Sequence, residues 1–301
     1  MRFSTSTNIY CYDQGKPYAI PMDESIQVCA EAGFRYVDAN LCGITRPGHA
    51  ISALCRDDWE EEIRRYRQEA DRLHVKIAQS HAWWCTKPTI PYTELPEGDF
   101  GEEMMRRSIL ASEILGVKWM VVHPFSVTEN GERSKERSLP YNLTYYRRWN
   151  EVCKAHHVGM AIENMVGVHG NEWGDMDFLI QLVDAVADPN VGICLDTGHA
   201  NVTGLDVAEC VRKAGRRLHA THINDNYARG VDEHLAPMCG NVKWPEVFKA
   251  LKEVDYEDDF SYEIHKYTHM YPKELQPELI RFTYHLGKWL LQENGWTDTA
   301  G

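Results

Sequence analysis

Several features that define common protein classes are missing from this chain. No run approaches the roughly 18 apolar residues that a membrane-spanning helix needs. The opening residues, MRFSTSTNIYCYDQG, lack the basic segment and apolar stretch of a secretory signal peptide. No long basic block is present, and 45 acidic against 32 basic residues leave a net charge of −13. Because such a chain is repelled by phosphate backbones, we expect neither a membrane nor a nucleic acid as partner.

The cysteines show no pairing pattern. Their number, nine, is odd, and none of them has the CxxC spacing of a metal or redox motif. The sequence therefore predicts free thiols in a reducing compartment, and we expect a cytoplasmic protein. The nine positions are Cys11, Cys29, Cys42, Cys55, Cys85, Cys153, Cys194, Cys210 and Cys239.

Short apolar or β-branched runs alternate with longer amphipathic stretches along the whole chain. Eight strand–helix pairs in 301 residues, with no break in composition, predict one α/β domain over 1–301 with the (β/α)8 TIM-barrel fold. Residues from about 292 to 301 are expected to form a C-terminal tail. The competing fold, a doubly wound open sheet, lacks its usual support because no GxGxxG or GxxxxGK[ST] loop occurs. Strands are expected near 2–9, 34–39, 75–80, 117–123, 158–163, 191–196, 218–223 and 259–264, and helices near 23–34, 57–74, 100–116, 141–157, 176–188, 205–215, 244–254 and 274–294.

Carboxylate and imidazole side chains stand where four of these strands end. They are Glu163, Asp196, His222 and Glu263. In a barrel the carboxyl ends of all strands meet on one face, so these four predict one divalent-metal site. The absence of a thiolate from the set disfavours a closed structural zinc site. Mn²⁺ is the first expectation for the ion, and Mg²⁺, Co²⁺ and Zn²⁺ also suit these ligands.

Other residues near the same face are candidates for the substrate site. His81 and His123 end two earlier strands, and Trp84 lies in one of three long connections, 40–56, 81–99 and 124–137. Arg229, seven residues after His222, is predicted to anchor a carboxylate, phosphate or hydroxyl of the substrate. The alternatives are loop histidines held by hydrogen bonds, aromatic packing within the loop and a solvated arginine.

The motifs resemble those of the xylose-isomerase-like superfamily of barrels, specifically its sugar isomerase/epimerase branch. The matching segments are GFRYVDA, AIENM, CLDTGHAN, THINDN, DEHLAPMCGNVKWPEVFKAL and SYEIH. The resemblance implies one metal on the four residues above, with Glu163 and Glu263 as the acid/base pair and His199 touching the substrate. Asp232 and His234 are expected to support the site from behind the metal ligands. Two motifs depart from the family pattern, because 222–225 reads HIND instead of HxKD and 237–240 reads PMCG instead of PGxG.

The resemblance predicts a metal-dependent isomerase or epimerase of sugars or keto-polyols. A glutamate would remove the proton beside a carbonyl held by the metal and pass through an enediolate. The expected partner is a small carbohydrate or polyol, and a homo-oligomer or a small partner subunit stays open. Three alternatives share the fold: a lyase or dehydratase, including a catalytic subunit that cleaves C-glycosides; an abasic-site endonuclease with three metals; and a non-catalytic sugar-binding barrel.

Overall fold

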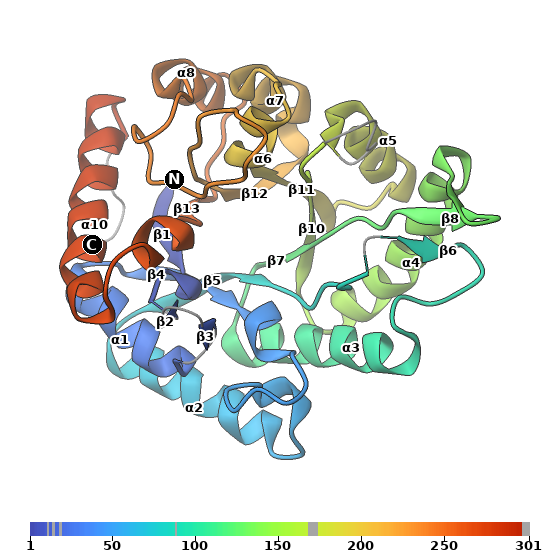
Figure 1. The fold of residues 1–301 in the computed structure, drawn as a ribbon, viewed down its shortest axis with the longest axis horizontal. Helices are drawn as coiled ribbons and strands as arrows, with labels where there is room; N and C mark the ends of the chain where they lie inside the picture. The colour runs from blue at the N-terminus through green and yellow to red at the C-terminus, as the bar shows by residue number, and fades with distance from the viewer. Residues whose placement is uncertain (11, 14–15, 18–19, 88, 168–173, 297–301) are drawn as a thin grey trace.

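The chain forms a nearly closed barrel of eight parallel strands surrounded by helices (Figure 1). The computed structural model describes residues 1–301 except 11, 14–15, 18–19, 88, 168–173 and 297–301. The strand order is β12-β11-β10-β7-β5-β4-β1-β13, so neighbours in the sheet are successive strands of the barrel. This confirms the predicted single (β/α)8 barrel. The strands are β1 (Arg2–Ser6), β4 (Tyr36–Asn40), β5 (Lys76–His81), β7 (Trp119–Val122), β10 (Gly159–Glu163), β11 (Val191–Asp196), β12 (Leu218–His222) and β13 (Asp259–Tyr262).

Each barrel strand is followed by a long helix on the outside of the sheet (Figure 1). The helices pack through apolar positions three and four residues apart, as in α8, where Trp244, Val247, Phe248 and Leu251 are buried. The strands read as continuous apolar runs because both of their faces are covered; all five residues of β10 are buried. The helices are α1 (Met22–Ala32), α2 (Trp59–Arg72), α3 (Gly98–Leu115), α4 (Lys135–Ala155), α5 (Met176–Val186), α7 (Val207–Ala214), α8 (Trp244–Glu253) and α10 (Gln276–Glu293).

Several short elements sit between strands and helices and were not expected from the sequence. Two are helices directly after barrel strands, α6 (Thr197–Val202) after β11 and α9 (His265–His269) shortly after β13. The others are β2 (Tyr12–Asp13), β3 (Lys16–Pro17), β6 (Ile90–Pro91), β8 (Val127–Glu129), β9 (Glu132–Arg133) and the 3-10 turns η1 (Thr7–Tyr10), η2 (Leu41–Ile44), η3 (Ala53–Cys55), η5 (Gly215–Arg217) and η6 (Lys273–Leu275).

The first strand and the segment before α4 differ most from the sequence prediction. The first strand ends at Ser6 rather than near residue 9, and η1 takes over. The connection over 124–137 is not a plain loop, since β8 and β9 pair as a hairpin that turns at Asn130 and Gly131, both with positive φ. Helix α4 then begins at Lys135 with Ser134 as its cap, six residues earlier than expected. Pro140 lies inside this helix.

The barrel is closed at one seam, between β12 and β13. Only a single bridge, Ile223 with Tyr262, joins the two strands there as a backbone pair. The Thr221 hydroxyl completes the seam by donating to the Asp259 carbonyl at 2.6 Å and accepting from the Ser261 amide at 3.3 Å. The two strands that carry His222 and Glu263 therefore meet at the weakest join of the sheet.

No helix in the described part of the chain combines the length and apolar character needed to cross a membrane. The eight cysteines that the structure describes are all free, and Cys11 lies outside the described residues. The expected C-terminal tail begins inside α10, which runs to Glu293, and residues 297–301 are outside the described part.

Acid sensitivity is expected from His269 in α9. Burial lowers its pKa from 6.5 to about 4, although its hydrogen bond to the Asn8 carbonyl acts in the opposite direction. Between pH 6.5 and 4 the His269 imidazole is therefore protonated in the unfolded chain but neutral in the folded chain. Stability falls as the pH drops through this window. The variant His269→Gln keeps a donor for Asn8 and should lose up to about 3 kcal/mol less than the parent on going from pH 7 to 4. Urea unfolding at both pH values measures the difference, and equal losses in the two proteins would contradict it.

Candidate metal and active site

The four residues predicted as metal ligands converge at the carboxyl end of the barrel. Glu163, Asp196 and His222 are the last residues of β10, β11 and β12, and Glu263 directly follows β13. One ligand atom from each lies within 4.8 Å of the others, and the side chains of the first three are buried. Parallel strands with a common register bring these positions to one rim, as the sequence pattern required.

The ring nitrogens of His222 are surrounded by carboxylate oxygens, which can accept hydrogen bonds or bind a cation but cannot donate. The Nδ1 atom of His222 lies 3.0 Å from Glu163 Oε1 and 3.6 Å from Glu263 Oε2. Its Nε2 atom, on the other side of the ring, faces a carboxylate of β4, Asp38, at 3.2 Å. An imidazole with one ring proton cannot donate in both directions, so either a second proton or a metal ion must stand between Nδ1 and the glutamates. A divalent cation fits this donor set of three carboxylates and one imidazole.

Charges in the site shift its pKa values strongly. Burial alone would raise the pKa of Glu163, but the charge of His222 and hydrogen bonds from His123, His222 and His81 hold it well below its usual range. Burial raises the pKa of Asp196 to about 6 against the opposing charges of His199 and His234. The pKa of His222 is raised although burial lowers it, chiefly by Cys194, Glu163 and Glu263. Without metal, protons on the imidazoles neutralise the carboxylates, and metal binding would have to release them.

Asp196 is held by hydrogen bonds from two segments, its own helix α6 and the HIND segment at the end of β12. Its Oδ1 accepts the amide of His199 at 2.6 Å, which caps α6, and its Oδ2 accepts the Asn224 side chain at 2.8 Å. Asn224 lies in the HIND segment, 222–225. Its amide packs against Gly198, where a Cβ atom would lie 1.7 Å from Asn224 Oδ1. Asn224 thus supplies a neutral donor to Asp196.

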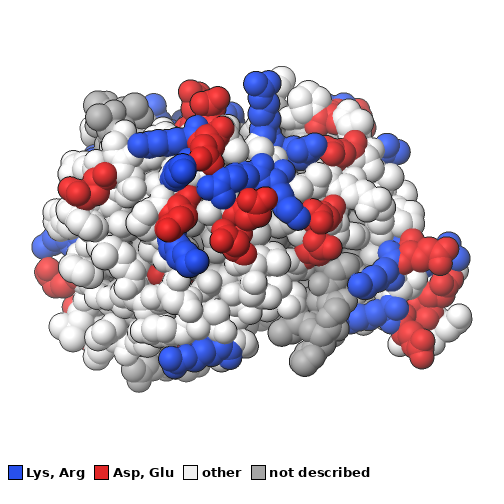
Figure 2. Space-filling model, turned by 90° about the horizontal axis from the view of Figure 1, so that it is seen from above, with Lys and Arg blue, Asp and Glu red and all other residues white. Residues whose placement is uncertain are grey.

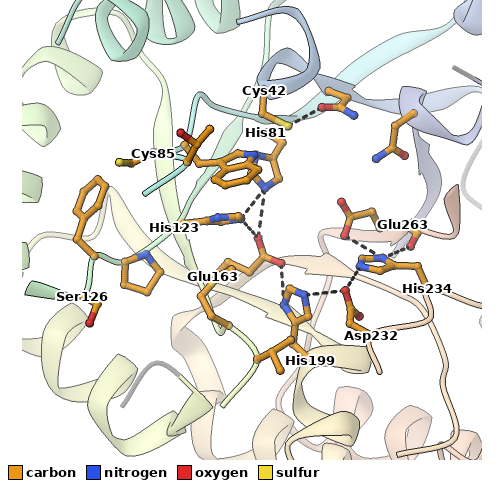
Figure 3. Close-up of a pocket in the computed structure, with 18 of the residues that line it drawn as sticks. Cys42, His81, Cys85, His123, Ser126, Glu163, His199, Asp232, His234 and Glu263 are labelled. Carbon is orange, nitrogen blue, oxygen red and sulfur yellow. Dashed lines mark hydrogen bonds and ion pairs between the residues drawn. The ribbon is translucent and has the colours of Figure 1, made fainter. Parts of the chain in front are cut away.

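His81 and His123 face each other beside Glu163. Their Nε2 atoms are 2.9 Å apart, and they lie 3.4 and 3.0 Å from Glu163 Oε2 (Figure 3). His81 Nδ1 donates to the Ala82 carbonyl, which turns its Nε2 toward the site. The Trp84 ring leans against His123 at 5.7 Å, with Arg46 5.1 Å above the indole. The structure brings these three predicted substrate contacts together on one side of the pocket.

A second cluster forms around Asp232, on the loop after β12. Its Oδ2 atom lies 2.7 Å from His234 Nε2 and 3.7 Å from His199 Nε2 (Figure 3). The other ring nitrogens of the two histidines bond to the carbonyls of Glu263 and Asn164. Asp232 and His234 therefore line the pocket wall rather than standing behind the ligands, and with His199 they could hold a metal ion of their own.

Arg229 is a predicted substrate contact that the structure does not bring to the pocket. It lies in an exposed turn, and its guanidinium stacks over the Tyr227 ring at 5.0 Å. It does not occur among the described residues that line the pocket. Its distance from His222 along the chain could be read from the sequence, but the direction in which the loop leaves the barrel could not.

The pocket above these clusters has a volume of about 580 Å³. Figure 3 shows Cys85 and Ser126 on the side of the pocket away from Glu263 and His234. Besides the carboxylates and imidazoles, the lining includes apolar side chains, among them Trp84, Ile90, Pro124, Phe125, Met165 and Val166.

Sequence reasoning missed three polar residues of this region. Asp38 lies inside the barrel in β4, the rings of His265 and His234 pack in a tilted arrangement with their centroids 4.4 Å apart, and Asn224 binds Asp196. A carboxylate in the middle of a predicted barrel strand was a signal for Asp38, because a buried carboxylate needs a partner. His265 follows Glu263 by two residues and carries no comparable signal.

Eight parallel strands with carboxylates and imidazoles at their carboxyl rim define a TIM barrel with a candidate metal site. A sequence model of the xylose isomerase-like TIM barrel matches residues 26–286. The chain belongs to this family, which confirms the resemblance inferred from its motifs.

Its relatives include proteins of more than one activity. The uncharacterized protein y4fM of Sinorhizobium fredii is 24% identical over 273 residues, which are 84% of this chain and 82% of that protein. A D-psicose 3-epimerase of Enterocloster bolteae is 26% identical over 159 residues, 52% of this chain and 50% of the enzyme. A protein named "Probable endonuclease 4" of Geobacillus kaustophilus is 30% identical over 177 residues, 52% of this chain and 56% of its own. The chain thus spans about half the length of the two named enzymes.

Solved structures of sugar epimerases share the fold. A D-tagatose 3-epimerase-like protein matches with a TM-score of 0.71 and 22% identity over 95% of this chain and 98% of the other. A D-psicose 3-epimerase crystallised in the presence of D-fructose matches with a TM-score of 0.75 and 14% identity, over 97% and 99% of the two chains. At such identities the likeness establishes a common architecture and leaves the reaction to the residues of the site.

Proposed function

We propose that this protein is a divalent-metal-dependent epimerase or isomerase of keto sugars or keto-polyols. The observation that carries the proposal is the pair Glu163 and Glu263, which approach His222 Nδ1 from two different strands at 3.0 and 3.6 Å. Both carboxylates face the pocket, and Asp196 lies beneath them. Of the expected ions we place Mn²⁺ first, and the free thiols suit a cytoplasmic enzyme.

The roles of the four residues differ. A bound divalent cation would polarise a carbonyl and make the neighbouring C–H acidic. Asp196 and His222 do not occur among the described residues that line the pocket, so they serve to hold the cation. Glu163 and Glu263 line the pocket and can each also exchange a proton with the substrate. Removal by one glutamate and return by the other inverts a carbon centre, whereas return to the adjacent carbon interconverts ketose and aldose.

Deuterium incorporation tests the reaction and the substrate together. The metal-loaded protein is incubated in D₂O with free ketoses, keto-polyols and keto-glycosides, and NMR identifies the carbon that gains deuterium. Deuterium at the carbon beside the carbonyl in an epimer supports epimerisation. Loss of water or of an aglycone would support the lyase reaction that begins with the same proton abstraction. No exchange with any member of a broad panel, by protein shown to contain metal, would contradict the proposal.

A second candidate is metal-dependent cleavage of a phosphodiester at an abasic site. The observation in its favour is the His199, Asp232 and His234 group, which offers ligands for a further ion beside the first. The net charge of −13 stands against it. So does the surface over α7 and α8, where acidic and basic side chains alternate and pair, as Arg212 does with Glu253, instead of forming a basic stripe (Figure 2).

A duplex containing one abasic site separates the two candidates. We expect no strand cleavage above that of the free metal when the protein is loaded with Zn²⁺ or Mn²⁺. Cleavage that disappears in Asp232→Asn and weakens steeply with salt would move the endonuclease to first place.

A further inference from the structure

Asp38 is a buried carboxylate on β4 that lines no part of the pocket. Its side chain is fully buried, and its Oδ2 atom lies 3.2 Å from His222 Nε2 and 2.8 Å from Gln79 Nε2. Gln79 stands on the neighbouring strand β5 and reaches the carbonyl of Thr221 as well, at 3.4 Å. The carboxylate therefore lies on the side of His222 opposite to the predicted metal ligands.

The imidazole of His222 is fixed on three sides. Its Nδ1 faces Glu163 and Glu263, its Nε2 faces Asp38, and its face stacks on the His81 ring with a centroid distance of 5.5 Å and an interplanar angle of 8°. A carboxylate accepts and cannot donate, so Asp38 draws the single proton of a neutral imidazole to Nε2. The lone pair then remains on Nδ1, where Glu163 and Glu263 converge.

Other buried aspartates of the barrel have an evident structural task, and Asp38 does not. Asp225 accepts the amides of Met238 and Val242 and the Trp244 indole, and so ties down the loop after β12. Asp259 pairs with Arg2 through two bonds of 2.8 and 2.9 Å. Asp38 has no arginine, lysine or backbone amide among its described hydrogen-bond partners, and its Oδ1 has no partner at all. Burying such a group costs stability, which indicates a functional reason for it.

We propose that Asp38 is a positioning residue that sets the tautomer and orientation of His222 for metal binding. The proposal rests on the metal site proposed above. A carboxylate behind a ligating histidine raises the basicity of the ligand and holds its ring in place, and loss of such a partner weakens metal affinity about 10- to 100-fold. Gln79 in turn holds Asp38, so the supporting chain runs from β5 through β4 to the ligand on β12.

Asp38→Asn tests the role without changing the size of the side chain. Co²⁺ and Zn²⁺ affinities are measured by competition with a chelator, and the visible absorption of the Co²⁺ protein reports the geometry around the ion. We expect metal affinity about 10- to 100-fold weaker than in the parent and an altered Co²⁺ spectrum. Asp259→Asn is the matched control, because it makes the same chemical change in the barrel without touching His222. It should lower stability and leave both metal readouts unchanged.

A measurement on the unaltered protein covers the case in which Asp38→Asn does not fold. In the Zn²⁺ form, nitrogen-15 NMR of the imidazole side chains should identify His222 as carrying its proton on Nε2. A proton on Nδ1, or an Asp38→Asn protein with parental affinity and spectrum, would overturn the inference and leave the proposed function standing. If the parent protein itself binds neither metal, both the inference and the proposed function fail.

Discussion

Glu163→Gln and Glu263→Gln are each expected to reduce epimerase turnover about 10²- to 10⁴-fold, the contribution of a positioned general acid–base group. An amide cannot accept the proton from carbon, although it keeps the shape of the glutamate. The two variants should also differ from each other. Because each glutamate serves one side of the substrate, each variant should lose deuterium exchange with one epimer and retain exchange with the other.

The control for this pair is Glu253→Gln, in α8, whose carboxylate pairs with Arg212 on the surface. It should retain full turnover. Metal content is measured in every variant, because Glu163 and Glu263 are also predicted ligands and a lost ion alone would lower the rate. Near-normal rates in both pocket variants would rule out the two-glutamate mechanism.

Metal removal is expected to have the second large effect. Protein freed of metal with a chelator should be inactive, and its three clustered carboxylates should make it less stable. Metal supplied at 100 times its Kd should restore about 2.7 kcal/mol of stability, the value for any ligand that binds only the folded state. His222→Ala should lose most of this gain. Urea unfolding with and without Mn²⁺, Co²⁺ or Zn²⁺ gives the comparison.

The pH dependence of binding adds a check with a defined sign. In the metal-free protein the pKa of His199 is raised to about 10, since Asp196, Asp232 and Glu163 outweigh the effect of burial, and that of His222 is raised as well. A proton on His222 competes directly with the metal, and a proton on His199 places a positive charge beside the ligands Glu163 and Asp196, so metal affinity should increase from pH 6 to pH 9. His156→Ala, on the surface beside Glu113, should not change this profile. Affinity that is constant over the range would mean that the imidazoles do not titrate with the metal.

The sequence was sufficient for the barrel and for the convergence of Glu163, Asp196, His222 and Glu263. The short apolar runs predict the eight strands, and in a (β/α)8 barrel the carboxyl ends of all strands lie on the same face. The four residues at strand ends were therefore expected to lie close together. Loops obey no such rule. Local turns and packing between distant segments determine the structure of the loops. They set the position of Arg229, the hairpin at Asn130 and Gly131, and the helices α6 and α9.

Asp38 illustrates a different limit. Its residue type and its place on a strand were visible in the sequence, but its partner is 184 residues away. Only the closed barrel, in which β4 and β12 face each other across the interior, makes the pair. Asn224 is a similar case. The sequence shows only that the HIND segment differs from the expected HxKD pattern, whereas the structure shows that Asn224 donates a hydrogen bond to Asp196.

The seam between β12 and β13 links occupancy of the site to the integrity of the barrel. Its amides at Ile223 and Glu263 donate across the join, to Ser261 and Ile223, and Glu263 itself is one of the residues that would bind the ion. A fluctuation that opens the sheet here separates His222 from Glu263 and dismantles the site. A bound ion would therefore oppose this opening with its binding free energy, and it would stabilise the pair of neighbouring strands that has the fewest backbone pairs in the barrel.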